Sequence, residues 1–214
     1  MHRVPDDRPL PSPPSSATFP PTSAAIFDLD GTLADTMPVH YRVWTEVALR
    51  YGLSFPEERF YSLGGVPTAK IAAILAAEQN LTIDPVALAL EKEQTVLLRV
   101  DEVRPIVPVV EIARAAMAVG PVAIASGGSR AMVERTLRQI GVDSWFPVVV
   151  TAEDTARHKP EPDVFLEAAR RMGVAPEICT VYEDTDLGLE AARRAGMRPV
   201  DVRPLYVQRR ITAR

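Results

Sequence analysis

The stretch AAIFDLDGT, residues 24–32, decides the fold of this chain. A short apolar run ends abruptly in Asp28 and Asp30, followed by Gly31, and this pattern is typical of a buried strand that emerges at the edge of a sheet. Further apolar runs of this kind follow along the chain, at 121–126, 147–151, 179–184 and, more weakly, 198–202. The sequence therefore predicts a series of short buried strands that begins at residue 24.

Helical patterns lie between these runs. Beyond the run at 121–126, for example, Val133, Leu137 and Ile140 fall on one face of a predicted helix. Strands that alternate with helices indicate a parallel sheet covered on both faces. We therefore predict an α/β fold with a three-layer, Rossmann-like core.

The segment from about residue 38 to residue 100 departs from this alternation of strands and helices. It holds several helical patterns, at 39–50, 68–78 and 85–99, and no convincing buried strand. We predict that residues 37–102 form an inserted α-helical cap domain. The α/β core would then consist of residues 24–36 and 103–202.

The two ends of the chain differ from the rest in composition. Residues 1–23 contain seven prolines among serines and threonines, and such a segment cannot bury enough apolar surface to offset the entropy of ordering. We predict a disordered proline-rich tail there. Residues 203–214 contain four arginines and no acidic residue, and we predict a solvated C-terminal tail.

Bulk properties exclude several classes of function. A formal net charge of -4 over 214 residues gives no sign of the basic surface that nucleic acids require. No apolar run reaches the roughly 18 residues that span a bilayer, and no secretory signal precedes the first strand. The single cysteine, Cys179, cannot form an internal disulfide. We expect a cytoplasmic protein with no nucleic acid, no membrane and no obligate protein partner.

Polar side chains follow the predicted strands at the point where each strand ends. These are Asp28, Asp30, Ser126, Glu183 and Asp184. Because the carboxyl ends of parallel strands form a common ligand crevice, we expect these side chains to converge there. Lys159, in the loop 157–163, can reach the same crevice. The set provides a nucleophile, a proton-transfer group, donors for phosphate oxygens and hard oxygen ligands for Mg²⁺, which are the requirements of phosphoryl transfer.

Four motifs in this chain resemble those of the haloacid dehalogenase-like (HAD) superfamily. They are DLDGT (28–32), Ser126, HKPEPD (158–163) and YEDTDLGLEAARRAGM (182–197), in the same order and at similar spacing. The helical insertion after DLDGT is similar to the cap of the β-phosphoglucomutase-like subfamily. The pattern GVPT (65–68) resembles the fructose-1-phosphate phosphatase branch of that subfamily.

The resemblance implies a role for each core residue. Asp28 would attack phosphorus, and Asp30 would protonate the leaving alcohol and then activate the water that hydrolyses the aspartyl-phosphate. Mg²⁺ would be bound by Asp28, by the backbone carbonyl of Asp30 and by Asp184, with Glu183 a direct or water-mediated ligand. The predicted phosphate-binding residues are Thr32, Ser126, Gly127 and Lys159. On the cap, the predicted substrate contacts are His40, Thr68 and Lys70.

Two other functions need to be weighed against a phosphatase. A β-phosphoglucomutase-like mutase must bind a second phosphate, and the positions matching its cationic donors are Thr68, Gly128 and Ser129, which carry no charge. This argues for hydrolysis unless Arg130 or Lys70 supplies the missing cation.

The second alternative is a non-enzymatic aspartyl-phosphate signalling domain. In such a domain the acidic pair and the phosphorylated aspartate lie on different strands, whereas Asp28 and Asp30 here follow one strand. We therefore predict a Mg²⁺-dependent phosphatase. Because a helical cap over the site limits substrate size, we expect the substrate to be a small phosphorylated metabolite, a sugar or polyol phosphate.

Overall fold

The computed structural model describes residues 23–207. Its core is a five-stranded sheet with strand order β5-β4-β1-β6-β7, in which every neighbouring pair is parallel. The strands are β1 (Ala24–Phe27), β4 (Val122–Ala125), β5 (Val148–Val150), β6 (Cys179–Glu183) and β7 (Arg198–Asp201). The predicted parallel sheet is therefore confirmed, and the strand that carries the DLDGT motif lies at its centre.

The register of the sheet brings the strand ends together. Phe27, the last residue of β1, lies opposite Ile124 of β4 and Tyr182 of β6. The rings of Phe27 and Tyr182 are stacked, with centroids 4.6 Å apart. Asp28 and Glu183 follow these paired residues directly, so both side chains reach the same edge of the sheet.

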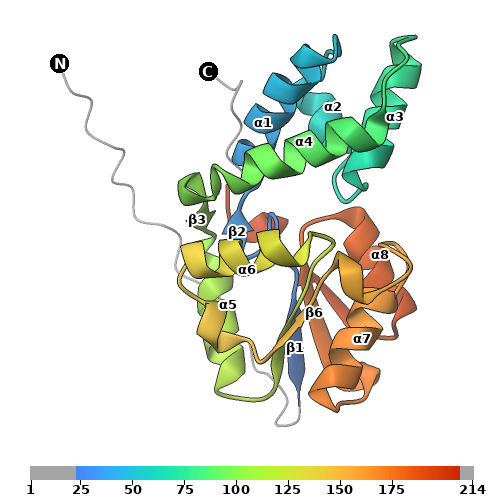
Figure 1. The fold of residues 1–214 in the computed structure, drawn as a ribbon. Helices are drawn as coiled ribbons and strands as arrows, with labels where there is room; N and C mark the ends of the chain where they lie inside the picture. The colour runs from blue at the N-terminus through green and yellow to red at the C-terminus, as the bar shows by residue number, and fades with distance from the viewer. Residues whose placement is uncertain (1–22, 208–214) are drawn as a thin grey trace, which may run out of the picture.

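Helices cover both faces of the sheet (Figure 1). On one side lie α5 (Val107–Met117) and α6 (Arg130–Gln139), and on the other α7 (Asp163–Met172) and α8 (Asp186–Arg194). Successive side chains of β1 point to opposite faces of the sheet, and both faces are buried. Ala25 and Phe27 pack against the first pair of helices, and Ala24 and Ile26 pack against the second. The three-layer α/β core that the sequence predicts is confirmed.

Four helices form the cap above the carboxyl end of the sheet (Figure 1). They are α1 (Met37–Arg50), α2 (Glu57–Ser62), α3 (Thr68–Glu78) and α4 (Pro85–Leu97). The cap has an apolar core of its own, which includes Trp44, Phe55 and Leu88. Helix α2 was not expected from the sequence, since its six residues are too few for a helical period to show.

A small antiparallel ribbon joins the cap to the core. It consists of β2 (Ala34–Asp35) and β3 (Arg104–Pro105), with Ala34 opposite Pro105. The chain enters the cap after β2 and leaves it before β3. The two connections therefore run side by side, and the position of the cap over the sheet is determined at this ribbon.

The ends of the described chain differ from the prediction. The predicted tail at 1–23 lies outside the described residues except for Ser23, and so do residues 208–214. The start of the predicted C-terminal tail packs on the core instead: Leu205 and Tyr206 contact the apolar cluster around Phe27, and Arg203 pairs with Asp186. The prediction is based on the arginine content of 203–214 and does not consider the few apolar residues of this segment.

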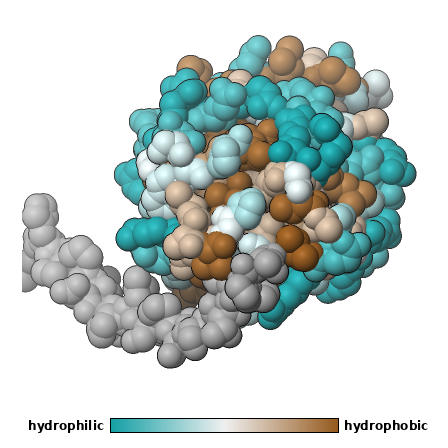
Figure 2. Space-filling view, turned by 90° about the horizontal axis from the view of Figure 1, so that it is seen from below, coloured by the Kyte–Doolittle hydropathy of each residue, from teal (hydrophilic) through white to brown (hydrophobic). Residues whose placement is uncertain are grey.

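Seen from the amino-terminal edge of the sheet, hydrophobic residues lie in the middle of the face and hydrophilic residues surround them (Figure 2). The exposed apolar side chains Met117, Val119 and Ile178 lie shortly before β4 and β6 in the chain. The acidic residues Asp28 and Glu183 lie at the opposite edge, where β1 and β6 end. None of the helices between residues 23 and 207 is long and apolar enough to span a membrane.

Candidate active site

A buried ion cluster lies where β1 and β6 end. Lys159 donates hydrogen bonds to Asp28 Oδ1 at 2.6 Å and to Glu183 Oε1 at 2.8 Å. All three side chains are almost inaccessible to water. The loop before α7 therefore brings Lys159 across the crevice, as the sequence predicts for an ammonium that serves the strand ends.

Burial determines the protonation of this cluster. It raises the pKa of Asp28 to about 8, because Lys159 only partly offsets burial and the nearby charges of Glu183 and Asp30. Burial, Glu183 and Asp28 also raise the pKa of Asp184 well above its usual range. For Lys159, burial alone would lower the pKa, but Asp28 and Glu183 more than offset it and raise the pKa. Three buried carboxyl groups share one ammonium, so they cannot all ionise unless a further cation binds beside them, and this favours a cation site.

Three carboxylates have the geometry of a metal site. One oxygen from each of Asp28, Glu183 and Asp184 lies within 4.8 Å of the other two. Thr32 Oγ1 donates a hydrogen bond of 3.1 Å to Asp184, and a Cβ atom on Gly31, where φ is +82°, would lie only 2.2 Å from Asp184 Oδ2. Three hard oxygen donors of this kind fit Mg²⁺, which would hold them in their ionised form. The turn after β1 is therefore shaped around Asp184.

The carboxylate of Glu183 has several other partners. It accepts hydrogen bonds from the Thr185 amide at 2.6 Å and from Thr185 Oγ1 at 3.1 Å, in addition to Lys159. A Cβ atom on Gly188, at the start of α8, would lie 1.8 Å from Glu183 Oε1. These contacts restrict Glu183 to one orientation, which suits a residue that positions Lys159 or a metal-bound water.

Asp30 faces the cap. His40 Nε2 lies 3.7 Å from Asp30 Oδ1, which is an ion-pair separation and too long for a hydrogen bond. Both atoms are buried without a hydrogen-bond partner in the described part of the chain. Burial opposes ionisation of Asp30, but His40, with Thr36 and Lys92, lowers its pKa. Two unpaired polar atoms side by side in the cavity wall are suited to bind one hydroxyl or ester oxygen of a substrate.

The loop after β4 forms the third side of the site. Ser126 is buried, and its hydroxyl accepts a hydrogen bond of 3.0 Å from the Gly128 amide. A Cβ atom on Gly128 would lie 3.5 Å from Asp30 Oδ2, so this loop runs close to the acidic motif. It leads directly into α6, whose N-terminal amides favour anions.

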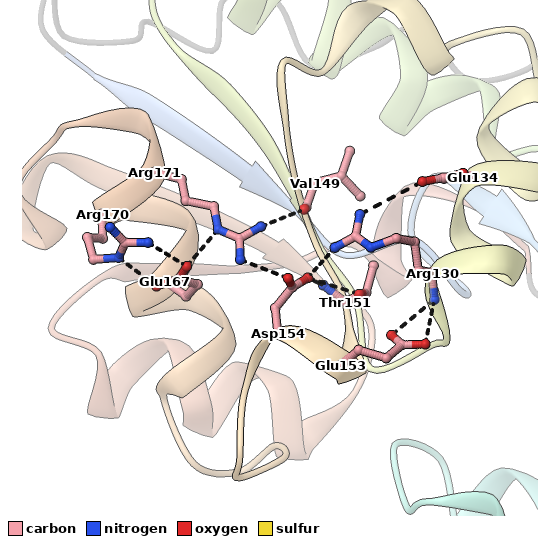
Figure 3. Close-up of polar contacts among 9 residues, drawn as sticks. All are labelled: Arg130, Glu134, Val149, Thr151, Glu153, Asp154, Glu167, Arg170 and Arg171. Carbon is pink, nitrogen blue, oxygen red and sulfur yellow. Dashed lines mark hydrogen bonds and ion pairs between the residues drawn. The ribbon is translucent and has the colours of Figure 1, made fainter.

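An ion-pair network braces this loop from outside (Figure 3). The Arg130 side chain lies 2.5 Å from Asp154 Oδ2, and Asp154 also pairs with Arg171 of α7 at 2.8 Å. The backbone amide of Arg130 donates to Glu153 at 3.1 Å. Arg130 is therefore directed away from the ends of β1 and β6, and it does not contribute to the cavity there.

A cavity of about 350 Å³ separates the core from the cap. The predicted site residues that line it are Asp28, Asp30, His40, Thr68, Ser126, Gly127, Lys159 and Glu183. Apolar side chains of the cap, such as Trp44 and Phe60, form part of its wall. The structure thus brings most of the predicted residues around one space, to which both domains contribute.

Three predicted site residues do not line this cavity: Asp184, which belongs to the group of carboxylates with Asp28 and Glu183, and also Lys70 and Thr32. Lys70 is exposed, because Thr68 and Ile71 of α3 face the cavity and a residue two positions after Thr68 lies about 200° around the helix. The prediction that Lys70 contacts substrate is wrong for this arrangement. Thr32, predicted to bind phosphate, is instead fully buried and hydrogen-bonded to Asp184, because the turn after β1 directs its hydroxyl toward that carboxylate.

Sequence reasoning missed Lys92 and Glu93 of α4, which line the cavity. Lys92 Nζ lies 2.8 Å from His40 Nδ1 and 3.0 Å from Glu93 Oε1. The run of charges around Lys92 reads as a solvated helix face. A usable signal was present, however, because Lys92 lies four residues from both Leu88 and Val96, which are buried.

Residues 22–196 match the profile of the haloacid dehalogenase-like hydrolases, and the chain belongs to this family. It is 42% identical to fructose-1-phosphate phosphatase YqaB of Escherichia coli K12, over 84% of this chain and 96% of that protein. It is 31% identical to hexitol phosphatase A of the same organism, over 76% of this chain and 74% of that protein.

The fold is also similar to solved structures. β-Phosphoglucomutase from Clostridium difficile has a TM-score of 0.73 and 25% identity, with 84% of each chain covered. The predicted family, the α/β fold and the enzyme class, a phosphatase of the HAD-like hydrolases, are confirmed by these comparisons.

Proposed function

We propose that this chain is a Mg²⁺-dependent phosphatase that hydrolyses a small sugar or polyol phosphate through an aspartyl-phosphate on Asp28. One observation carries the proposal: Asp28, hydrogen-bonded to Lys159 at 2.6 Å, faces a cavity of about 350 Å³ between core and cap. This volume is at the small end of the roughly 300–1,000 Å³ that ligand pockets occupy. Relatives named for fructose 1-phosphate and hexitol phosphates support the substrate class.

In the first half of the reaction, Asp28 attacks phosphorus and the ester bond breaks. Asp30, on the same turn, gives its proton to the departing alcohol oxygen. Lys159, the Ser126 hydroxyl and the Gly127 amide neutralise and orient the phosphate oxygens. The products of this half are the free alcohol and phosphorylated Asp28.

In the second half, Asp30 removes a proton from a water molecule, which attacks the phosphorus and releases Asp28. The base must be ionised for this step, which the lowered pKa of Asp30 beside His40 favours. The proton that Asp30 takes from the water restores the acid that the first half of the next turnover needs. Mg²⁺ at Asp28, Asp184 and the Asp30 carbonyl, with Glu183 as an inner or outer ligand, would offset the repulsion between the Asp28 carboxylate and the phosphate.

The mutase alternative requires a cation for a second phosphate. Lys70 and Arg130 do not line the cavity. Of the lysines and arginines that the structure describes, only Lys92 and Lys159 do so. Lys159 serves the reacting phosphate, and Lys92 is paired with Glu93 at 3.0 Å. This arrangement favours hydrolysis over isomerisation.

The test is a panel of phosphate esters with Mg²⁺. Fructose 1-phosphate, sorbitol 6-phosphate and β-glucose 1-phosphate with catalytic glucose 1,6-bisphosphate are assayed for free phosphate and for glucose 6-phosphate. We expect phosphate release from at least one sugar or polyol ester, abolished by exhaustive chelation and by Asp28→Asn. Efficient glucose 6-phosphate formation with little free phosphate would overturn the proposal in favour of a mutase, and full activity after chelation would remove Mg²⁺ from it.

A further inference from the structure

The cap contributes a pair of opposite charges to the cavity. Lys92 Nζ lies 3.0 Å from Glu93 Oε1, 2.8 Å from His40 Nδ1 and 6.0 Å from the centre of the Trp44 ring. Glu93 Oε1 also accepts a hydrogen bond of 2.7 Å from Thr68 Oγ1. The ammonium of Lys92 is therefore surrounded by partners from the cap itself.

The two charges of this pair are not equally accessible. The Lys92 side chain is only 4% exposed, whereas the Glu93 side chain is 34% exposed. Burial opposes ionisation of Glu93, but Lys92, His40 and Thr68 more than offset it and lower the pKa of Glu93. A substrate that enters the cavity therefore meets the carboxylate of Glu93 more readily than the ammonium of Lys92.

We propose that Glu93 is a specificity residue: it accepts hydroxyl groups from the unphosphorylated end of the substrate and excludes substrates that carry a second phosphate there. The inference rests on the proposed function, which places the reacting phosphate at Asp28 and Lys159. A sugar or polyol hydroxyl donates a hydrogen bond to a carboxylate, whereas a second phosphate brings like charge against it. Glu93 also keeps Lys92 neutralised, so that Lys92 does not become a phosphate-binding cation.

Glu93 has a second possible role that the experiment must separate. Glu93 holds Lys92 in place, Lys92 contacts His40, and His40 lies beside Asp30. Glu93 could therefore act only by positioning these side chains. If Glu93 only positioned these residues, its loss would reduce turnover of every substrate by the same factor. If Glu93 selects by charge, its loss should instead change kcat/KM in opposite directions for substrates with one phosphate and with two.

The experiment compares Glu93→Gln with the wild type on fructose 1-phosphate and fructose 1,6-bisphosphate, measured as kcat/KM for phosphate release. Glu91→Gln is the matched control, because Glu91 lies on the same helix, pairs with Arg50 and does not line the cavity. Glu93→Asp, which keeps the charge, is the conservative variant. Melting temperatures establish that each variant is folded.

We expect Glu93→Gln to shift the ratio of kcat/KM values at least tenfold toward the bisphosphate, with Glu91→Gln and Glu93→Asp close to the wild type. An equal loss on both substrates, or an unchanged ratio, would overturn the inference. In the wild type, added salt should narrow the preference for the monophosphate, because screening weakens charge repulsion. A preference that does not change with salt would count against Glu93 even if no variant folds.

A binding measurement separates this inference from the proposed function. Calorimetric titration of Asp28→Asn and of Asp28→Asn with Glu93→Gln by fructose 1,6-bisphosphate needs no turnover. The double variant should bind the bisphosphate at least tenfold more tightly. If the wild type releases no phosphate from any sugar ester but this difference appears, the proposed function fails and the role of Glu93 stands. Equal affinities refute the role of Glu93 regardless of activity.

Discussion

Replacement of Lys159 by methionine tests the electrostatics of the buried cluster. Lys159 is 7% exposed and hydrogen-bonded to Asp28 and Glu183, which are also buried. Methionine retains most of the apolar stem and removes the ammonium. The variant leaves the carboxylates of Asp28, Glu183 and Asp184 without their neighbouring cation.

The magnitude follows from the burial of these groups. Removing one partner of a buried ion pair costs about 3–5 kcal/mol, because the remaining charge is uncompensated. For a chain of this size that corresponds to a fall in melting temperature of roughly 6–20 °C. The pKa of Asp28 is already raised to about 8 with Lys159 present, and its removal raises that pKa further. When a carboxyl has a higher pKa in the folded than in the unfolded state, the protein becomes less stable as pH rises toward the folded-state pKa. Because Lys159→Met raises the pKa of Asp28 further, its loss of stability relative to the wild type should be larger at pH 9 than at pH 5.

Urea unfolding of Mg²⁺-free protein at both pH values measures this cost. Lys70→Met is the matched control, since Lys70 is exposed on the cap and its loss should change stability by no more than about 0.5 kcal/mol. Added Mg²⁺ should restore part of the stability of Lys159→Met by binding the same carboxylates. If Lys159→Met is within about 1 kcal/mol of the wild type at pH 9, Lys159 does not offset repulsion among these carboxylates, and the argument for a metal there fails.

Two further variants test the surroundings of the site. Gly31→Ala forces a Cβ atom against Asp184 at 2.2 Å, so it should raise the Mg²⁺ concentration for half-maximal activity at least tenfold; an unchanged Mg²⁺ titration would show that Asp184 is not a ligand. Burial raises the pKa of Asp154, but pairing with Arg171 and Arg130 and hydrogen bonds from Thr151 outweigh it and lower this pKa to about 2. Asp154→Asn should therefore reduce the free energy of unfolding at pH 7 by about 1–2 kcal/mol, measured by urea unfolding. This stability is present above the unfolded pKa and lost between about pH 4 and 2, so equal acid sensitivity of variant and wild type would contradict it.

The core of the site was predictable because strand ends are local features of the sequence. An apolar run that stops at Asp28 or Ser126 already indicates the edge where the strand emerges. In a parallel sheet the carboxyl ends of the strands lie at one edge, and the observed register of Phe27 with Ile124 and Tyr182 brings the ends of β1, β4 and β6 together there. Nothing about the packing of individual side chains was needed for this prediction.

The cap was less predictable because its side chains depend on tertiary packing. A helical pattern locates α3 and α4 in the chain, but which face turns to the cavity depends on how the cap sits on the core. Lys70, which the sequence predicts to contact substrate, is exposed, whereas Lys92, which stands in a run of charged residues, is buried. A charged residue on the apolar face of a helix, as Lys92 is beside Leu88 and Val96, is the feature that identifies such a site in sequence.

The segment after β7 shows a related limit. The composition of 203–214 predicts a solvated tail, because arginines are common there. Two apolar residues, Leu205 and Tyr206, nevertheless pack on the core, and Tyr206 Oη donates a hydrogen bond of 2.5 Å to the Gly31 carbonyl. Composition averages over a segment, whereas docking depends on a few residues.

Direct detection of the phosphorylated residue tests the central claim. Asp30→Asn protein with Mg²⁺ is incubated with acetyl phosphate, whose leaving group needs no protonation. The acyl phosphate is then reduced with borohydride, which converts a phosphorylated aspartate to homoserine, and the peptides are read by mass spectrometry. We predict homoserine at position 28 in Asp30→Asn, because that variant forms the intermediate and hydrolyses it slowly, and none in Asp28→Asn. Modification at another residue, or none at Asp28 although the wild type releases phosphate, would contradict the proposed mechanism.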